Sequence, residues 1–153
     1  MLKPFQKKII DSMVKQEKLL FKLYTLFAAQ FPQHAQLWNE LAKEESKHAS
    51  WLTQLHEAAD KGVVLFEEGR IKTYTMTSFI EYLEQIIAKA ENNELTLAHA
   101  VASALDLERS LLEKNVFSHF EGMADKARSV LKQLAKETEN HVGTVQRLKD
   151  SLS

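Results

Sequence analysis

The stretch LAKEESKH at residues 41–48 decides the fold, because it returns as LAKETENH at residues 134–141, 93 positions later. The two copies agree at five of eight positions, and both end in histidine. A glutamate also precedes each copy at a similar distance, since Glu17 and Glu108 lie 91 positions apart. These nearly equal offsets indicate that the chain consists of two related halves.

Each copy lies within a long stretch whose apolar residues recur every three or four positions, which is typical of amphipathic helices. Four such helices are predicted, over residues 5–30, 33–61, 94–120 and 123–149. Pro32 and Gly122 mark the short turns within the two helix pairs, and Gly62 ends the second helix. Short turns make the two helices of each pair antiparallel neighbours.

The connection between the two helix pairs is long, covering residues 62–93. It is predicted to hold a shorter helix over 79–91, because Ser78 with Glu81 three residues later matches a capping box. A helical pair, a long crossover and a second pair predict an all-α fold, the ferritin-like four-helix bundle. The 153 residues suffice for a single domain over 1–153.

The composition excludes several classes of protein. With four glycines and two prolines the chain has too few turn residues for a many-stranded sheet fold. The net charge of −1 gives no basic surface for nucleic acid, and no apolar stretch is long enough to span a membrane. The amino terminus lacks the layout of a signal peptide, so a cytoplasmic location is expected. Without cysteine, any metal must be bound by carboxylates and imidazoles.

Polar residues interrupt the apolar stripe of each long helix near its middle. In the first half, Glu17 lies 15 residues before Pro32, whereas Glu45 and His48 lie 13 and 16 residues after it. Because the two helices are antiparallel, these three side chains are expected at about the same height in the bundle. In an apolar interior their burial is costly unless a cation compensates it.

The second half repeats this arrangement. Glu108 lies 14 residues before Gly122, while Thr138 and His141 lie 16 and 19 residues after it. All the interruptions therefore converge on one level of the bundle. An isolated glutamate or histidine on an apolar stripe is usually a hydrogen-bonded core residue or lies at the edge of the stripe. A group of such residues at one height, contributed by four helices, favours a metal site. Carboxylate and imidazole ligands together suit iron, manganese or zinc.

At these residues the sequence resembles the rubrerythrin family of the ferritin-like superfamily over about residues 10–149. The family pattern is a glutamate on the first and third helices and Glu-x-x-His on the second and fourth, which together bind two irons. The resemblance implies that the metal ligands here are Glu17, Glu45, His48, Glu108 and His141. It also implies that Tyr24, seven residues after Glu17, donates a hydrogen bond to a ligand carboxylate or packs in the core.

Thr138 departs from the family pattern, because it stands where the fourth helix requires the glutamate that bridges two metals. A neutral hydroxyl cannot bridge as a carboxylate does. Two alternatives follow: Glu137 swings in as a substitute, or Glu45 is the one remaining bridge and the site binds one ion, or a second one weakly.

The expected function is that of an iron-binding protein with rubrerythrin-like peroxidase or ferroxidase chemistry. Its partners would be peroxide or oxygen and a separate electron donor, because the cysteine-bound iron centre of full-length rubrerythrins is missing here. The resemblance also implies a homodimer. The alternative is a degenerate bundle without catalysis, which acts as a binding or assembly module. His34, His56, His99 and His119 are expected to lie on the surface or at its edge.

Overall fold

The computed structural model describes residues 4–60, 73–113 and 125–152. These residues form helices and turns and contain no strand. Their elements are α1 (Pro4–Gln30), a short 3-10 helix η1 (Pro32–His34), α2 (Ala35–Asp60), α3 (Thr73–Glu91), α4 (Leu97–Glu113) and α5 (Asp125–Ser151). The predicted all-α class is therefore confirmed, and each long stretch of helical periodicity corresponds to a helix.

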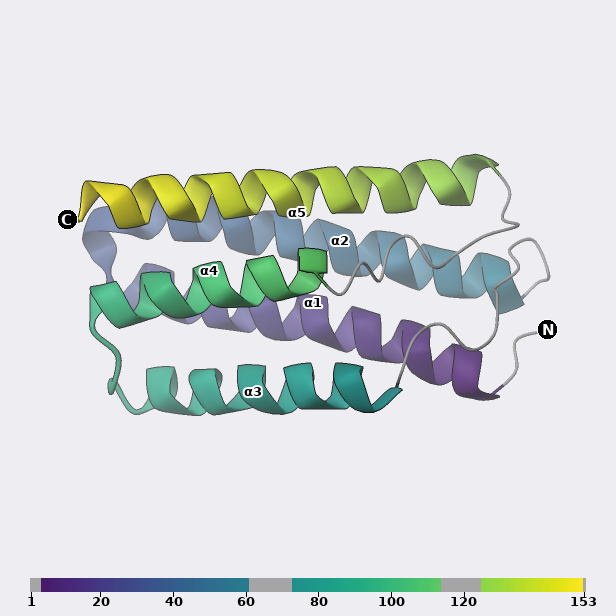
Figure 1. Cartoon of the computed structure of the whole chain (residues 1–153), viewed down its shortest axis with the longest axis horizontal. Coiled ribbons are helices and arrows are strands. Elements are labelled where there is room, and N and C mark those ends of the chain that lie inside the picture. The colour runs from purple at the N-terminus through teal and green to yellow at the C-terminus, as the bar shows by residue number, and fades with distance from the viewer. Residues whose placement is uncertain (1–3, 61–72, 114–124, 153) are drawn as a thin grey trace.

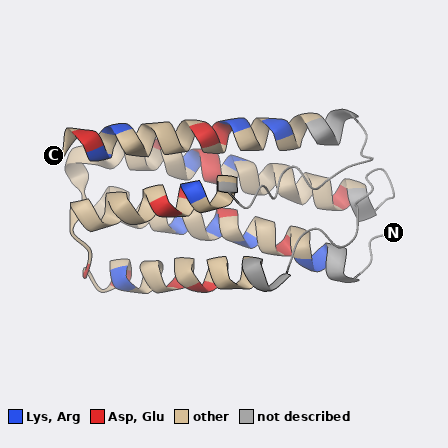
Figure 2. Ribbon diagram, viewed as in Figure 1, with Lys and Arg blue, Asp and Glu red and all other residues tan. Residues whose placement is uncertain are grey.

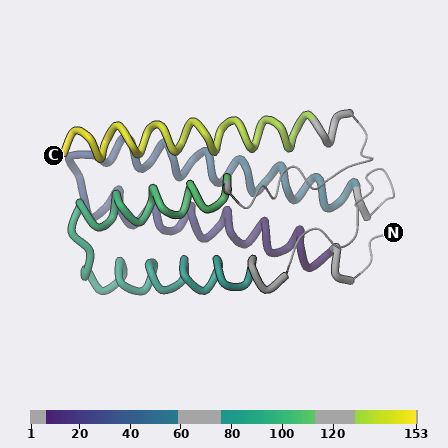
Figure 3. The backbone as a smooth tube through the Cα atoms, viewed as in Figure 1, coloured from purple at the N-terminus to yellow at the C-terminus, as the bar shows by residue number. Residues whose placement is uncertain are grey.

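The four helices of the two pairs, α1, α2, α4 and α5, run along a common axis, and α3 lies beside α1 as a fifth helix (Figure 1). Contacts join α1 to α2, α4 to α5 and α2 to α5, while α3 packs on α1. The backbone trace shows the two antiparallel pairs and the crossover between them (Figure 3). The predicted ferritin-like arrangement of pair, crossover helix and pair is confirmed.

The starts of α2, α3 and α4 differ from the prediction. Helix α2 begins at Ala35 and not at residue 33, because Pro32–His34 form η1. Helix α3 begins at Thr73, so Ser78 lies inside the helix and does not cap it. Helix α4 begins at Leu97 and not at residue 94, because the hydroxyl of Thr96 accepts a hydrogen bond from the backbone N–H of His99 at 3.2 Å. This is the geometry of an N-cap. The predicted stops at Gly62 and Gly122, and the helix end at residue 120, lie outside the described residues.

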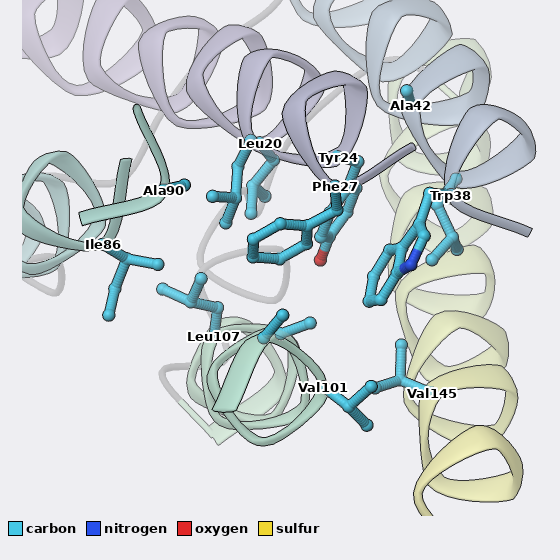
Figure 4. Close-up of a cluster of buried hydrophobic side chains, with 14 of the residues drawn as sticks. Leu20, Tyr24, Phe27, Trp38, Ala42, Ile86, Ala90, Val101, Leu107 and Val145 are labelled. Carbon is cyan, nitrogen blue, oxygen red and sulfur yellow. The ribbon is translucent and has the colours of Figure 1, made fainter. Parts of the chain in front are cut away.

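The apolar core consists of two clusters. The larger one occupies the end of the bundle near the α1–α2 turn, where Tyr24 and Phe27 of α1 and Trp38 of α2 gather with Val101 and Val145 of the second pair (Figure 4). The smaller one fills the opposite end with Ile9, Ile10, Met13, Leu52, Leu55, Met76, Leu131 and Leu134. On α1, α2 and α5 the buried glutamates and histidines fall between the two clusters in sequence. The polar residues thus form a layer inside an otherwise apolar interior.

The charged residues outside this layer are mixed in sign. Lys and Arg alternate with Asp and Glu along α1 and α5 (Figure 2), as expected for a net charge of −1. Cross-helix ion pairs such as Lys15–Glu84 at 3.3 Å and Lys22–Glu91 at 3.1 Å join α1 to α3. Both pairs are exposed, so they contribute little to stability. Among the described helices, none has an apolar segment of the length that a membrane crossing requires.

Candidate metal centre

Five buried side chains from four helices converge in the polar layer. They form two trios whose ligand atoms lie within 4.8 Å of one another, Glu17 with Glu45 and His48, and Glu45 with Glu108 and His141. Glu45 belongs to both trios and links them. The structure therefore brings together every residue that the resemblance implies as a ligand.

Both histidines turn the same ring nitrogen toward the centre of the layer. In the first trio, Nδ1 of His48 lies 3.4 Å from Oε2 of Glu45 and 3.7 Å from Oε2 of Glu17. In the second, Nδ1 of His141 lies 2.9 Å from Oε1 of Glu45 and 3.5 Å from Oε1 of Glu108. The i, i+3 spacing places Glu45 and His48 on one face of α2, which aims both at the same point.

The outer nitrogens of the two rings contact carboxylates of the opposite helix. Nε2 of His48 lies 3.1 Å from Oε1 of Glu137 on α5, and Nε2 of His141 pairs with Oε2 of Glu44 on α2. A carboxylate on the outer nitrogen fixes the tautomer and the orientation of a metal-ligating imidazole. The sequence analysis did not identify Glu44 as a partner of His141. The available signal was the repeat, in which Glu44 occupies the same position as Glu137.

Glu137 is fully engaged outside the two trios. Besides His48, its carboxylate pairs with Nζ of Lys47 at 2.9 Å and accepts a hydrogen bond from Nε2 of Gln133 at 2.9 Å. Burial alone would raise the pKa of Glu137, but the donors Gln133, Lys47 and His48 together lower it to about 2. The side chain therefore supports His48 in this structure and does not lie in the place of a bridging ligand.

Thr138 occupies the fourth-helix position and brings no charge to the layer. Its side chain is 2% exposed, and its hydroxyl donates to the backbone oxygen of Leu134 at 2.9 Å within α5. This back-bond uses the only hydrogen that the side chain can donate. The equivalent position in the first half holds Glu45.

Tyr24 connects the polar layer to the larger apolar cluster. Its hydroxyl donates a 2.6 Å hydrogen bond to Oε1 of Glu108, and its ring packs 5.6 Å from that of Trp38. Burial, followed by the negative charge of Glu108, raises the pKa of Tyr24 well above its usual value. The phenol thus stays protonated and holds Glu108 in place.

The family model that the chain matches is rubrerythrin, over residues 8–149. The chain belongs to the rubrerythrin family. A search of curated proteins and a search of solved structures each found no match. The matched range includes both trios and the two outer carboxylates. The polar layer is therefore the candidate metal site of this rubrerythrin-family chain.

The protonation of the layer shows how its charges are balanced. Burial, with the nearby Glu45, raises the pKa of Glu17 well above its usual value. Burial would lower the pKa of both imidazoles, but Glu17 and Glu45 raise that of His48 to about 10, and Glu108 and Glu45 raise that of His141 to about 12. The carboxylates thus stabilise positive charge in the layer, and either protons on the histidines or bound metal ions can provide that charge.

The hydrogen bonding of the layer fits a metal. Five of its inward polar atoms are buried and make no well-aligned hydrogen bond among the described residues, namely Oε2 of Glu17, Oε1 of Glu45, Oε2 of Glu108 and Nδ1 of His48 and of His141. Nδ1 of His141 and Oε1 of Glu45 lie 2.9 Å apart, but as an ion pair without hydrogen-bond geometry. Buried polar atoms are almost always satisfied, so such a group calls for an explanation. Each of these atoms is a ligand type that iron, manganese and zinc accept.

The other histidines that the structure describes do not join either trio. His99 is exposed and His34 is half-buried near the α1–α2 turn. His56 has a side chain that is 28% exposed and lies 3.8 Å from Asp11, away from the polar layer. His119 lies outside the described residues.

Proposed function

We propose that this rubrerythrin-family protein binds iron in the two trios and uses it in an oxidoreductase reaction with peroxide or oxygen. The observation that carries the proposal is the convergence of five buried ligand atoms, from four helices, that make no well-aligned hydrogen bond within the described part of the chain. The layer offers three carboxylates and two imidazoles, and Glu45 is shared. Manganese or zinc would fit the same donors.

The protein's own residues would hold the metals and set their surroundings. Glu17 and His48 would bind one ion, Glu108 and His141 the other, and Glu45 would contact both. When bound, two ferrous ions would supply two electrons and become ferric, and with two protons from solvent these would reduce one peroxide to two waters.

Other side chains would position these ligands. With metal bound and the imidazoles neutral, Glu137 and Glu44 would accept from the outer ring nitrogens, which would leave the lone pair of each Nδ1 for the centre. Tyr24 holds Glu108, and the apolar clusters on both sides limit the access of water. Because the chain has no cysteine, the electrons that restore the ferrous state would come from a separate donor.

Metal content and metal oxidation test this proposal. The protein would be expressed in iron-rich medium and purified without chelators, and its metal content would be measured by plasma mass spectrometry. We expect iron in the wild type and in Glu40→Ala, an exposed control on the same helix, and its loss in Glu45→Ala. Anaerobic addition of peroxide to the ferrous protein should then produce ferric absorbance. Iron that remains in Glu45→Ala would contradict the site.

The alternative function, a binding or assembly module without catalysis, is favoured by one observation. The pairs His141–Glu45 at 2.9 Å and His48–Glu45 at 3.4 Å can balance charge in the layer with protons alone. The absence of bound metal after iron-rich expression, together with an intact fold by circular dichroism, would support this alternative and contradict the iron proposal.

A further inference from the structure

Thr138 stands in the polar layer at the position where the other half of the repeat has a carboxylate. In the repeat it corresponds to Glu45, the residue that belongs to both trios. Its side chain is buried and lies one helical turn from His141. A threonine side chain ends at the γ position, two atoms short of the carboxylate oxygens of a glutamate. Since its hydroxyl hydrogen is donated to Leu134, the residue adds neither charge nor a free donor.

No nearby carboxylate of the described residues takes over this role. Glu137, the adjacent residue, is engaged by Lys47, Gln133 and His48. Glu44 contacts the outer nitrogen of His141. Both lie on the far side of an imidazole from the two trios.

The charge of the layer is then incomplete for two divalent ions. Histidine binds metal in its neutral form, so the trios supply three negative charges, from Glu17, Glu45 and Glu108, against four positive ones. One uncompensated positive charge in a buried site is costly. Glu45 alone would also have to separate two cations that repel each other.

We propose that a small carboxylate-type anion from solution, of the size of acetate, formate or bicarbonate, enters at Thr138 and binds both metal ions in place of the missing glutamate. This inference rests on the proposed metal function. The anion supplies the single negative charge that three glutamates leave unbalanced, and its two oxygens match those of a bridging carboxylate side chain. The second metal ion therefore binds tightly only when such an anion is present.

Glu44 offers the competing explanation of charge balance. It is the outer carboxylate of His141, and its side chain is 43% exposed, so water screens its charge. It also lies beyond the imidazole and offers no oxygen to both metal ions. If Glu44 nevertheless balances the layer, binding of the second ion is independent of any added anion.

Equilibrium dialysis with Mn²⁺ tests the inference on the full chain. The buffer would be free of carboxylate, phosphate and bicarbonate, with constant ionic strength, and acetate would be the added anion. Acetamide, which has nearly the same shape without charge, is the matched control. We expect the affinity for the second Mn²⁺ to rise about tenfold when acetate reaches ten times its own Kd, and acetamide to have no effect.

Two substitutions locate the effect. Thr138→Glu should bind two Mn²⁺ without acetate and lose the acetate dependence, because the side chain then fills the place. Thr138→Val keeps the size but removes the hydroxyl, and it should retain the acetate dependence. The wild-type titration decides the question even if Thr138→Glu does not fold.

The outcomes separate this inference from the function on which it rests. If two Mn²⁺ bind with affinities that acetate does not change, the anion inference is wrong and the metal site stands. If Thr138→Glu folds and keeps the acetate effect, the anion binds elsewhere and the inference is again wrong. If no Mn²⁺ binds with or without acetate, both the metal function and the inference fail.

Discussion

At the scale of single residues, the two histidines show how position and protonation are fixed together. The inward nitrogens of His48 and His141 face the glutamates of the trios, and the outer ones face Glu137 and Glu44. Glu137 of α5 contacts the histidine of α2, and Glu44 of α2 contacts the histidine of α5. Each of these two helices therefore orients the histidine of the other. Orientation of this kind reduces the freedom that a ligand must lose on binding metal.

Removing the support of His48 should weaken metal binding. Glu137→Ala deletes the acceptor of Nε2 and leaves the trio intact, so we expect metal affinity to fall about 10- to 100-fold. Glu137→Gln retains an acceptor oxygen and should recover part of the loss. Competition with a metal-chelating dye measures the affinity, and Glu139→Ala, at an exposed position of the same helix, is the control. Equal affinities of Glu137→Ala and the wild type would show that His48 needs no such support.

Tyr24 should contribute to stability through its bond to Glu108. Tyr24→Phe removes a buried 2.6 Å hydrogen bond to a carboxylate and keeps the ring, so we expect the free energy of unfolding to fall by about 1.5–3 kcal/mol. Tyr82→Phe is the matched control, because it removes a hydrogen bond to Asp106 at a side chain that is 37% exposed, where water replaces the lost partner, so its loss should stay within about 0.5 kcal/mol. Urea denaturation of the metal-free protein measures both values, and similar small losses would contradict the assigned role of Tyr24.

At the scale of elements, the helix starts distinguish true caps from apparent ones. Thr96 caps α4 through its hydroxyl, whereas Ser78 lies within α3 despite its capping-box spacing. We expect Thr96→Ala to lower the free energy of unfolding by about 1 kcal/mol, and Ser78→Ala to lower it by much less. Urea denaturation compares the two, and a larger loss for Ser78→Ala would place the start of α3 at Phe79.

The sequence predicted the helices and the polar layer because both depend on periodicity. Residues at spacings of three and four share a helix face, and similar distances from Pro32 bring Glu17, Glu45 and His48 to one level. The repeat relates Glu44 to Glu137, but the contact of Glu44 with His141 was not predicted, because it depends on how α2 and α5 pack across the two halves. The start of α3 was missed for a related reason, since packing on α1 outweighs a local capping signal.

At the scale of the whole molecule, the polar layer lies between two apolar clusters and weakens the fold that it interrupts. Burial opposes the charge on both imidazoles and on Glu17, so the metal-free protein maintains costly groups in its centre. A metal ion that satisfies them binds the native state and not the unfolded chain. Its binding free energy therefore adds to stability.

Metal should consequently raise the melting temperature in a way that depends on Glu45. With free metal at 100 times its Kd, we expect about 2.7 kcal/mol of added stability, or a rise in Tm of about 5–10 °C for a domain of this size. Glu45→Gln removes the ligand common to both trios and should abolish most of this rise, while Glu40→Gln, exposed on the same helix, should keep it. Thermal unfolding with excess Mn²⁺ and with chelator measures the difference for each protein. An equal rise in Glu45→Gln would place the bound metal outside the polar layer.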